Sequence, residues 1–293
     1  MDGLESVVEE ALSVLSRFGP VRFLSGGSAV IVGDTHGYPM VSRWAVGLWE
    51  GSYDYLVFLG DYVDRGPRGL ENLRVVLEAF LGDPGRVVLL RGNHESPLMN
   101  YFYGFYEEVS SYMGVGFYSV VSRLFPYLSY AAVLDGWFLV HGGIPCRSCT
   151  GGPEEPVSLG EIASEAGSVW GDVGSGLGPD NSVAFQLLWN DPRGQVEWFS
   201  PSIRGEGAYY YGVRAWTSFL ERNSLRGIIR AHEAVDAFHV WLPDGGEQNP
   251  AGKSVSAGKL EGAVITVFSS LYHGQRAGVL VLEGSELHFK TYS

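Results

Sequence analysis

The stretch "LVFLGDYVDRGPRG", Leu56 to Gly69, decides how the fold is interpreted. Four apolar residues are typical of a buried β-strand, and a glycine, two aspartates and an arginine follow directly. Acidic side chains at the end of a buried strand have two interpretations: a solvated turn or a functional site. The other strand ends of the chain distinguish between them.

The first half of the chain alternates between short apolar runs and segments with helical spacing. The runs 29–32, 55–59 and 86–90 predict buried strands. Between them, 39–50 and 67–81 carry the apolar spacing of helices. This alternation is typical of β-α-β units.

The second half is less regular. An aromatic helical stretch follows Met99, and its aromatics from Tyr101 to Tyr118 are interpreted mainly as core and helix packing. With no internal repeat and no clear break in composition, we expect one domain over residues 1–293. The remaining predictions are two strands in 130–140 joined at Asp135-Gly136, a glycine-rich excursion with one helix over 142–182, strands at 227–230, 236–242, 263–268, 278–282 and 286–290, and an exposed hairpin loop over 243–262.

Composition excludes several classes of protein. The 293 residues are 45% apolar, enough for a substantial core, and 33 acidic against 20 basic residues give a net charge of −13. We therefore expect no general binding to nucleic acid, which depends on clustered cations. The acidic N-terminus lacks the pattern of a signal peptide, and no apolar run could span a bilayer. These features predict a cytoplasmic protein that does not associate with membranes, and the charge favours basic peptides without locating the acids.

Polar side chains follow five of the predicted strands. In α/β folds, loops converge at the carboxyl ends of strands, and ligands bind there. Any one of these residues could be an ordinary loop residue, but five such ends together indicate a site, and four of the seven histidines lie there. The five ends are "GDTHG" (33–37), "GDYVDRG" (60–66), "RGNHE" (91–95), "HGG" (141–143) and "AHE" (231–233).

These residue types suit a site for two metal ions. Carboxylate, amide and imidazole ligands without cysteine suit Mn, Fe or Zn with positions left open for water. Two such ions about 3.5–4 Å apart can clamp the attacking and leaving oxygens of a displacement at phosphorus. A strand-end aspartate is a natural bridge between two ions, and metal-bound water supplies the nucleophile.

The ordered motifs resemble those of the PPP-type serine/threonine protein phosphatases within the calcineurin-like metallophosphoesterases. The first three motifs are also shared with bacterial symmetrical diadenosine tetraphosphatases. Three further stretches resemble the protein phosphatases more narrowly: "NYFYGFYEE" (100–108), "LLWNDP" (187–192) and "IRGEGAYYYG" (203–212). The resemblance implies the metallophosphoesterase fold, an αββα sandwich of two packed mixed β-sheets flanked by helices.

The resemblance also implies the role of each site residue. In relatives, one metal is held by an aspartate and a histidine, a second by asparagine and two histidines, and an aspartate bridges them. A histidine paired with an aspartate is the general acid, and two arginines bind phosphate. Asp34 and His36 match the ligands of the first metal, Asn93, His141 and His232 match those of the second, and Asp61 matches the bridging aspartate. His94 matches the general acid and Asp64 its partner, and Arg65 and Arg204 match the two arginines that bind phosphate. Glu95 and Glu233 are interpreted as supporting residues.

One loop departs from the family pattern. The family usually has "SAPNYCG", and this chain has "SSLYHG" (269–274). Tyr272 keeps the aromatic that overhangs the metals, so we predict that it borders the substrate groove. His273 replaces the usual cysteine and is interpreted as an exposed loop residue. The shape of the groove and inhibitor sensitivity therefore do not transfer from the family.

The two cysteines form the motif "CRSC" (146–149). Such a motif can be a redox pair or half of a zinc site. There is no second cysteine pair, and the segment follows a loop. We interpret Cys146 and Cys149 as two unpaired thiols or an incidental disulfide.

Together, these features predict hydrolysis of phosphoserine and phosphothreonine in phosphoproteins or phosphopeptides. The expected cofactors are two divalent or transition metal ions, with Mn favoured in vitro and Fe or Zn as alternatives. The alternatives are a symmetrical dinucleoside tetraphosphatase, another calcineurin-like phosphoesterase, and a non-catalytic scaffold. Regulatory subunits, physiological substrates and activity on phosphotyrosine are not specified by the sequence.

Overall fold

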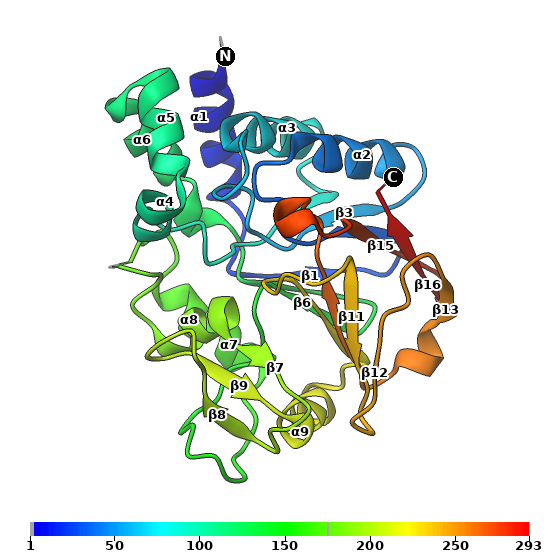
Figure 1. The fold of residues 1–293 in the computed structure, drawn as a ribbon. Helices are drawn as coiled ribbons and strands as arrows, with labels where there is room; N and C mark the ends of the chain where they lie inside the picture. The colour runs from blue at the N-terminus through cyan, green and yellow to red at the C-terminus, as the bar shows by residue number, and fades with distance from the viewer. Residues whose placement is uncertain (1–2, 175, 293) are drawn as a thin grey trace.

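The computed structural model describes residues 3–174 and 176–292, and two mixed sheets packed face to face form its centre (Figure 1). In the first sheet, β2, β3 and β4 are parallel, and β15 continues the sheet antiparallel to β2. Its order is β13 (Ser254–Ser256), β16 (Glu286–Thr291), β15 (Gly278–Glu283), β2 (Ala29–Val32), β3 (Tyr55–Phe58) and β4 (Val87–Leu89).

The second sheet combines parallel and antiparallel pairs. β6, β10 and β14 are parallel, whereas β5 and β11 run antiparallel to their neighbours β6 and β14. The order is β1 (Val21–Leu24), β5 (Ala131–Leu134), β6 (Trp137–Val140), β10 (Gly227–Arg230), β14 (Val264–Val267), β11 (Phe238–Trp241) and β12 (Glu247–Gln248).

Helices cover both outer faces. The first sheet is covered by α1, α2, α3, α5 and α6, and the second by α7, α8 and α9, as their shared apolar clusters show (Figure 1). The bounds are α1 (Leu4–Leu15), α2 (Pro39–Trp49), α3 (Gly69–Gly82), α4 (Pro97–Tyr103), α5 (Phe105–Met113), α6 (Val115–Ser122), η1 (Phe125–Tyr127), α7 (Leu159–Ser168), α8 (Ser182–Trp189), α9 (Val213–Asn223), η2 (Ala257–Leu260) and η3 (Tyr272–Gly274). This arrangement confirms the predicted α/β fold of two packed mixed sheets flanked by helices.

Strand β2 shows why the core strands are apolar throughout. Val30 and Val32 pack against the outer helices, and Ala29 and Ile31 pack between the two sheets. Because successive side chains point to opposite faces, a strand covered on both faces needs apolar residues at every position. The continuous apolar runs in the sequence follow from this double burial.

The strands of the two sheets end at a common edge. Beyond β2, Asp34 forms a parallel bridge with Phe268, which follows β14 of the other sheet. The backbone N–H of Ser269 donates to the Asp34 carbonyl at 3.1 Å. The carboxyl ends of β2, β3 and β4 are thereby joined to those of the second sheet.

One prediction about a connecting segment was wrong, and one about the aromatics after Met99 holds only in part. Residues 243–262 are not a simple hairpin loop, because β12 extends the second sheet and β13 pairs with β16 of the first. Strands of two and three residues leave little periodicity in a polar sequence. The aromatics after Met99 are also only partly core, since Tyr101, Phe102 and Tyr112 are 66–72% exposed while Phe105 and Tyr118 are buried.

One edge strand and a small third sheet were not predicted. β1 forms an edge of the second sheet, and a separate three-stranded sheet consists of β7 (Asp191–Pro192), β9 (Tyr209–Tyr211) and β8 (Phe199–Pro201).

Over the described ranges, no helix has both the length and the apolar character needed to cross a bilayer.

Substitution of Phe58 tests the packing of the first sheet. The Phe58 side chain is fully buried between β3 and the outer helices, whereas Phe23 is 64% exposed. We expect Phe58→Ala to lower the free energy of unfolding by about 3–5 kcal/mol, because it removes apolar contacts and leaves a cavity. Phe23→Ala should change it by less than about 1 kcal/mol. Denaturant unfolding of both variants measures the contrast, and equal losses would contradict the packing described.

Candidate metal centre

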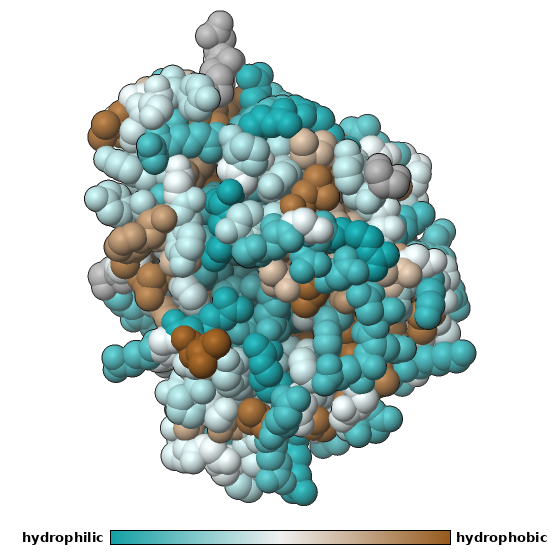
Figure 2. Space-filling view, viewed as in Figure 1, coloured by the Kyte–Doolittle hydropathy of each residue, from teal (hydrophilic) through white to brown (hydrophobic). Residues whose placement is uncertain are grey.

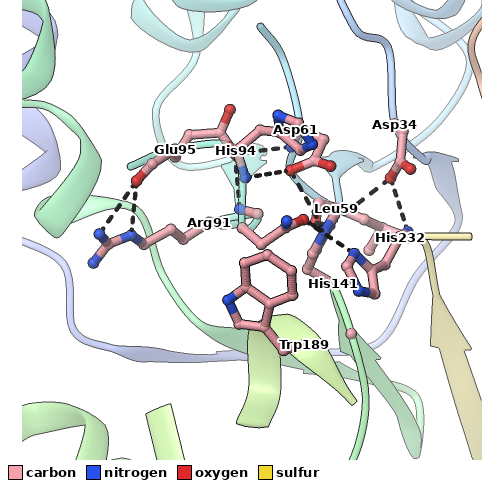
Figure 3. A network of polar contacts seen from close by, with 12 residues as sticks. Asp34, Leu59, Asp61, Arg91, His94, Glu95, His141, Trp189 and His232 are labelled. Atoms are coloured by element: carbon pink, nitrogen blue, oxygen red, sulfur yellow. Dashed lines mark hydrogen bonds and ion pairs between the residues drawn. The ribbon is translucent and has the colours of Figure 1, made fainter. Parts of the chain in front are cut away.

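All six predicted metal ligands meet at the common edge of the two sheets, and Figure 3 labels four of them, Asp34, Asp61, His141 and His232. They follow five different strands, so their proximity depends on the pairing of both sheets. None is more than 6% exposed. The strands and the ligands after them are β2 with Asp34 and His36, β3 with Asp61, β4 with Asn93, β6 with His141, and β10 with His232.

The loops that carry these ligands are unusually tight. A Cβ on Gly92 would lie 2.2 Å from Oδ1 of Asp61, and one on Gly60 would lie 2.4 Å from the Gly92 nitrogen. The two loops can therefore approach only with glycine at both positions. Positive φ at non-glycine residues is costly and often accompanies functional sites; it occurs here at His36, Asp61, Asp64, Arg65, His232 and His273.

Asp61 lies at the centre of the ligand set. Its Oδ2 is 3.6 Å from Nε2 of His36, and its Oδ1 is 3.4 Å from Nε2 of His141. Two groups with the spacing of metal ligands share this aspartate, and the ligand atoms in each lie within 4.8 Å of one another. The groups are Asp61 with His36 and His94, and Asp61 with His141 and His232.

Asn93 lies beside the group of His141 and His232, and Asp34 lies beside the group of His36. Oδ1 of Asn93 is 3.0 Å from Nε2 of His141 and 3.0 Å from Nδ1 of His232. Oδ2 of Asp34 is 3.9 Å from Nε2 of His36, and its Oδ1 accepts a hydrogen bond from the His232 backbone. Asp34 is thus adjacent to the first group, although His94 takes its place in the closest set of three.

The imidazoles are held as neutral ligands. Nδ1 of His36 donates to the Val63 carbonyl at 2.9 Å, and Nδ1 of His141 donates to the Leu59 carbonyl at 3.0 Å. A carbonyl can only accept, so each ring keeps a lone pair on Nε2. Burial lowers the pKa of both histidines well below the ordinary value. Both rings therefore present the neutral form that binds metal.

The carboxylates show that the site fits cations. Burial raises the pKa of Asp34 to about 6, and burial followed by the charges of Asp34 and Glu95 raises the pKa of Asp61 well above its usual range. In addition, Nδ1 of His232 and Nε2 of His141 converge on Oδ1 of Asn93 beside these carboxylates. A cation between these groups would stabilise the ionised carboxylates and be within reach of the ring nitrogens.

His94 is positioned by a second aspartate. Nδ1 of His94 lies 2.7 Å from Oδ2 of Asp64. Asp64 is itself fixed by hydrogen bonds from Nδ2 of Asn100 at 2.9 Å and from the Phe105 backbone at 3.0 Å. Asn100 was missed as a site residue, because an asparagine inside a helical stretch gives no local signal of a contact with Asp64.

The two predicted phosphate-binding arginines lie on the wall of the same cavity. Arg65 donates from Nε toward Nε2 of His94 at 3.3 Å and stacks on the ring of Tyr103, with 4.4 Å from Cζ to the ring centroid. Arg204 donates from Nε to Asp191 at 2.8 Å. Asp191 is fully buried and also binds Arg230. Its orienting contact with Arg204 was missed, although Asp191 lies within "LLWNDP".

The cavity has a volume of about 530 Å³ and is lined by the predicted site residues together with apolar and aromatic side chains. In Figure 2 the hollow at the centre of the visible face is hydrophilic. Tyr272 lies at the rim with its ring centroid 6.4 Å from that of His36, and His273 is exposed beside it. The remaining lining residues, which sequence patterns did not identify individually, are Met99, Phe102, Tyr103, Leu177, Trp189, Ala234 and Phe268.

The other predicted residues are placed as follows. Glu95 supports the Asp61 loop, and Glu233 pairs with Arg193 and Arg230. Arg68 lies in the opening stretch with Asp61 and Arg65 but was not assigned to the site; it is exposed and pairs with Glu71 of α3. Of the two alternatives for the cysteines, the structure has the disulfide between Cys146 and Cys149.

The fold and this buried set of Asp, Asn and His residues define a class, the metal-dependent phosphoesterases built on two packed mixed sheets. The chain belongs to the calcineurin-like phosphoesterase family, whose sequence profile matches residues 28–236. A catalytic subunit of protein phosphatase 2A from Dictyostelium discoideum is 35% identical over 207 residues. A probable serine/threonine-protein phosphatase of Encephalitozoon cuniculi is 33% identical over 282 residues.

These alignments cover 69% and 92% of this chain but only 61% and 52% of the two relatives. Among solved structures, a Saccharomyces cerevisiae protein serine/threonine phosphatase with similarity to human PP5 aligns with a TM-score of 0.73 at 22% identity, covering 99% of this chain and 89% of that one. A cold-active protein-tyrosine phosphatase of a psychrophilic Shewanella aligns at 0.61 and 15%, covering 96% and 84%. Both structures show the shared fold.

Glu95 offers a test of how the Asp61 loop is held. Its carboxylate accepts hydrogen bonds from the backbones of Asp61 and Gly92 at 2.8 Å and of Tyr62 at 2.9 Å. In Glu95→Gln, an amide N–H would face a backbone N–H. We expect a loss of roughly 1–3 kcal/mol in the free energy of unfolding, together with weaker binding of Mn.

Urea unfolding and Mn titration measure the two effects. Glu78→Gln, on the exposed face of α3, is the control and should change stability by less than about 0.5 kcal/mol. A Glu95→Gln protein with unchanged stability and Mn affinity would show that these hydrogen bonds do not hold the loop.

Proposed function

We propose that this chain hydrolyses phosphoserine and phosphothreonine monoesters in proteins. The observation that carries the proposal is the pair of ligand groups sharing Asp61, with Arg65, Arg204 and the His94–Asp64 pair around the same cavity. The two relatives, one named as a catalytic chain of a protein phosphatase and one as a probable serine/threonine-protein phosphatase, support the substrate class.

Two divalent or transition metal ions are the proposed cofactors, with Mn first and Fe or Zn as alternatives. Bound ions of this kind supply activation of water and neutralisation of charge at phosphorus. The ligand types support this choice, because oxygen and imidazole ligands without cysteine suit these metals. The residues proposed to hold the two ions are Asp34 and His36 on one side, Asn93, His141 and His232 on the other, and Asp61 between them.

The two arginines are proposed to bind the phosphoryl oxygens. A guanidinium offers paired N–H donors that match two oxygens at once. Arg204 is oriented for this by Asp191, which is buried and holds its Nε at 2.8 Å. Arg65 is oriented by stacking on Tyr103. Each arginine is therefore positioned before a substrate arrives.

His94 is proposed to donate a proton to the leaving alkoxide. Burial, and then the charges of Arg65 and Arg204, lower the pKa of His94. A phosphoryl group between the arginines would counter their charge, so the affinity of His94 for a proton should rise when substrate binds. Asp64 contacts Nδ1 and stabilises the protonated ring, which leaves Nε2 as the donor.

Residues 1–293 are proposed to form a single catalytic domain. The proposed metal ligands come from both sheets, so neither sheet carries the site alone. Tyr272, beside the metal ligands, is proposed to border the substrate groove. A cytoplasmic location rests on composition alone and stays a prediction.

The reaction class is tested with protein loaded with Mn, Fe(II) or Zn. We expect phosphate release from phosphoserine and phosphothreonine peptides with at least one of the metals. Efficient cleavage of diadenosine tetraphosphate with no release from the peptides would instead support a dinucleoside tetraphosphatase. A protein that retains none of these metals would support a non-catalytic scaffold.

Substitution of His94 tests the proton transfer. We expect His94→Asn to lower kcat about 10²–10⁴-fold on a phosphoserine peptide, because an alkoxide is a poor leaving group. On p-nitrophenyl phosphate, whose leaving group needs no proton, the loss should be far smaller. His288→Asn, on β16 away from the site, serves as the control. Equal losses on both substrates would remove His94 as the acid.

A further inference from the structure

A second groove adjoins the catalytic cavity. It has a volume of about 420 Å³, and Arg65 and Tyr103 line both spaces. On its other side it is lined by α5, through Glu107, Glu108 and Tyr112. A peptide whose phosphorylated residue occupies the catalytic cavity can therefore extend into this groove over Tyr103.

The groove carries one unpaired negative charge. Glu108 is already engaged, since its two oxygens accept hydrogen bonds from the backbones of Gly69 and Leu70 at 2.9 Å. Glu107 is exposed and, within residues 3–174 and 176–292, forms no ion pair or side-chain hydrogen bond. Many other exposed carboxylates of the chain have an arginine partner, as Glu9 has in Arg123 at 2.8 Å.

The one cation in the lining is directed to the catalytic side. The guanidinium of Arg65 lies 3.3 Å from His94 and stacks on Tyr103. It therefore does not neutralise Glu107 by direct contact. The charge that remains available in the groove is negative.

Two exposed aromatic rings accompany this charge. Tyr112 is 72% exposed and Tyr103 is 42% exposed. Aromatic rings attract cations over their faces and pack well against the methylene stems of lysine and arginine. A free carboxylate in one groove with two exposed rings fits a long basic side chain better than an acidic or a small apolar one.

A purely local role for Glu107 is the other interpretation of the same residue. It lies in the first turn of α5, where a negative charge interacts favourably with the helix dipole. Glu5 likewise lies in the first turn of its helix, α1, and is also exposed, but it lines neither the catalytic cavity nor this groove. Substituting each glutamate in turn therefore distinguishes an effect on helix stability from an effect on substrate binding.

We propose that the groove formed by Glu107, Tyr103 and Tyr112 binds a lysine or arginine side chain that flanks the phosphorylated residue of a protein substrate. This inference rests on the proposed function, because the phosphoryl group in the catalytic cavity sets the position of the peptide. Glu107 and Tyr112 are specificity residues under this proposal and do not touch the reacting atoms.

The test uses metal-loaded protein and a set of phosphoserine peptides that carry one lysine or one alanine at each of three positions on either side. For the wild type, we expect lysine at one or two positions to lower KM about three- to fivefold relative to alanine. Glu107→Gln should abolish this preference with kcat on the alanine peptides unchanged, and Tyr112→Ala should reduce it. Glu5→Gln should preserve it.

Salt provides a second readout. Because the contact is exposed, the lysine preference should weaken as NaCl is raised to about 0.5 M, and the KM of the alanine peptides should change less. Melting curves of the variants confirm that each is folded.

Two results would overturn the inference in different ways. If peptides are hydrolysed but lysine and alanine give equal KM, or Glu107→Gln keeps the preference, the groove does not bind a basic side chain. If neither the wild type nor any variant hydrolyses a phosphopeptide while another phosphate ester is cleaved, the proposed function fails. The proposal for the groove then fails as well, because it requires a protein substrate.

Discussion

The burial of two neighbouring carboxylates, Asp34 and Asp61, is the constraint on which the site depends. An ionised carboxylate out of water is costly, and a second one nearby adds repulsion, which is why burial raises the pKa of both groups. Such a cluster persists only with backbone donors and cations to offset the cost. The neutral imidazoles of His36 and His141 beside these carboxylates fit cations at this point.

Backbone donors from distant parts of the chain contribute to the same balance. The N–H of His94 donates to Asp61, and the N–H of His232 donates to Asp34, so each ligand loop stabilises the carboxylate of another. Buried acids outside the ligand set then fix the loops: Glu95 holds the backbone around Asp61, and Asp191 holds Arg204. Two kinds of buried carboxylate therefore organise the site: Asp34 and Asp61 belong to the predicted metal ligands, and Glu95 and Asp191 hold the surrounding chain.

Much of the fold, and the position of the predicted ligands at strand ends, could be predicted from the sequence because both depend on local patterns. The doubly buried strands read as apolar runs, and Asp61 and Asn93 come shortly after such runs. Residues without a local pattern were not found. Asn100 acts through a contact with Asp64 that lies 36 positions away, and β12 and β13 are too short to show a period.

By itself, the sequence determined which strands form the core and which chemical groups stand at their ends, since strand burial and ligand type are local properties. Only the tertiary structure decided which of those ends meet. The pairing of β2 with β3 and of β6 with β10, and the bridge from Asp34 to Phe268, join the two sheets at one edge. The tertiary structure likewise decided that Tyr103 and Tyr112 near Glu107 are exposed, because the exposure of an aromatic residue depends on what packs against it.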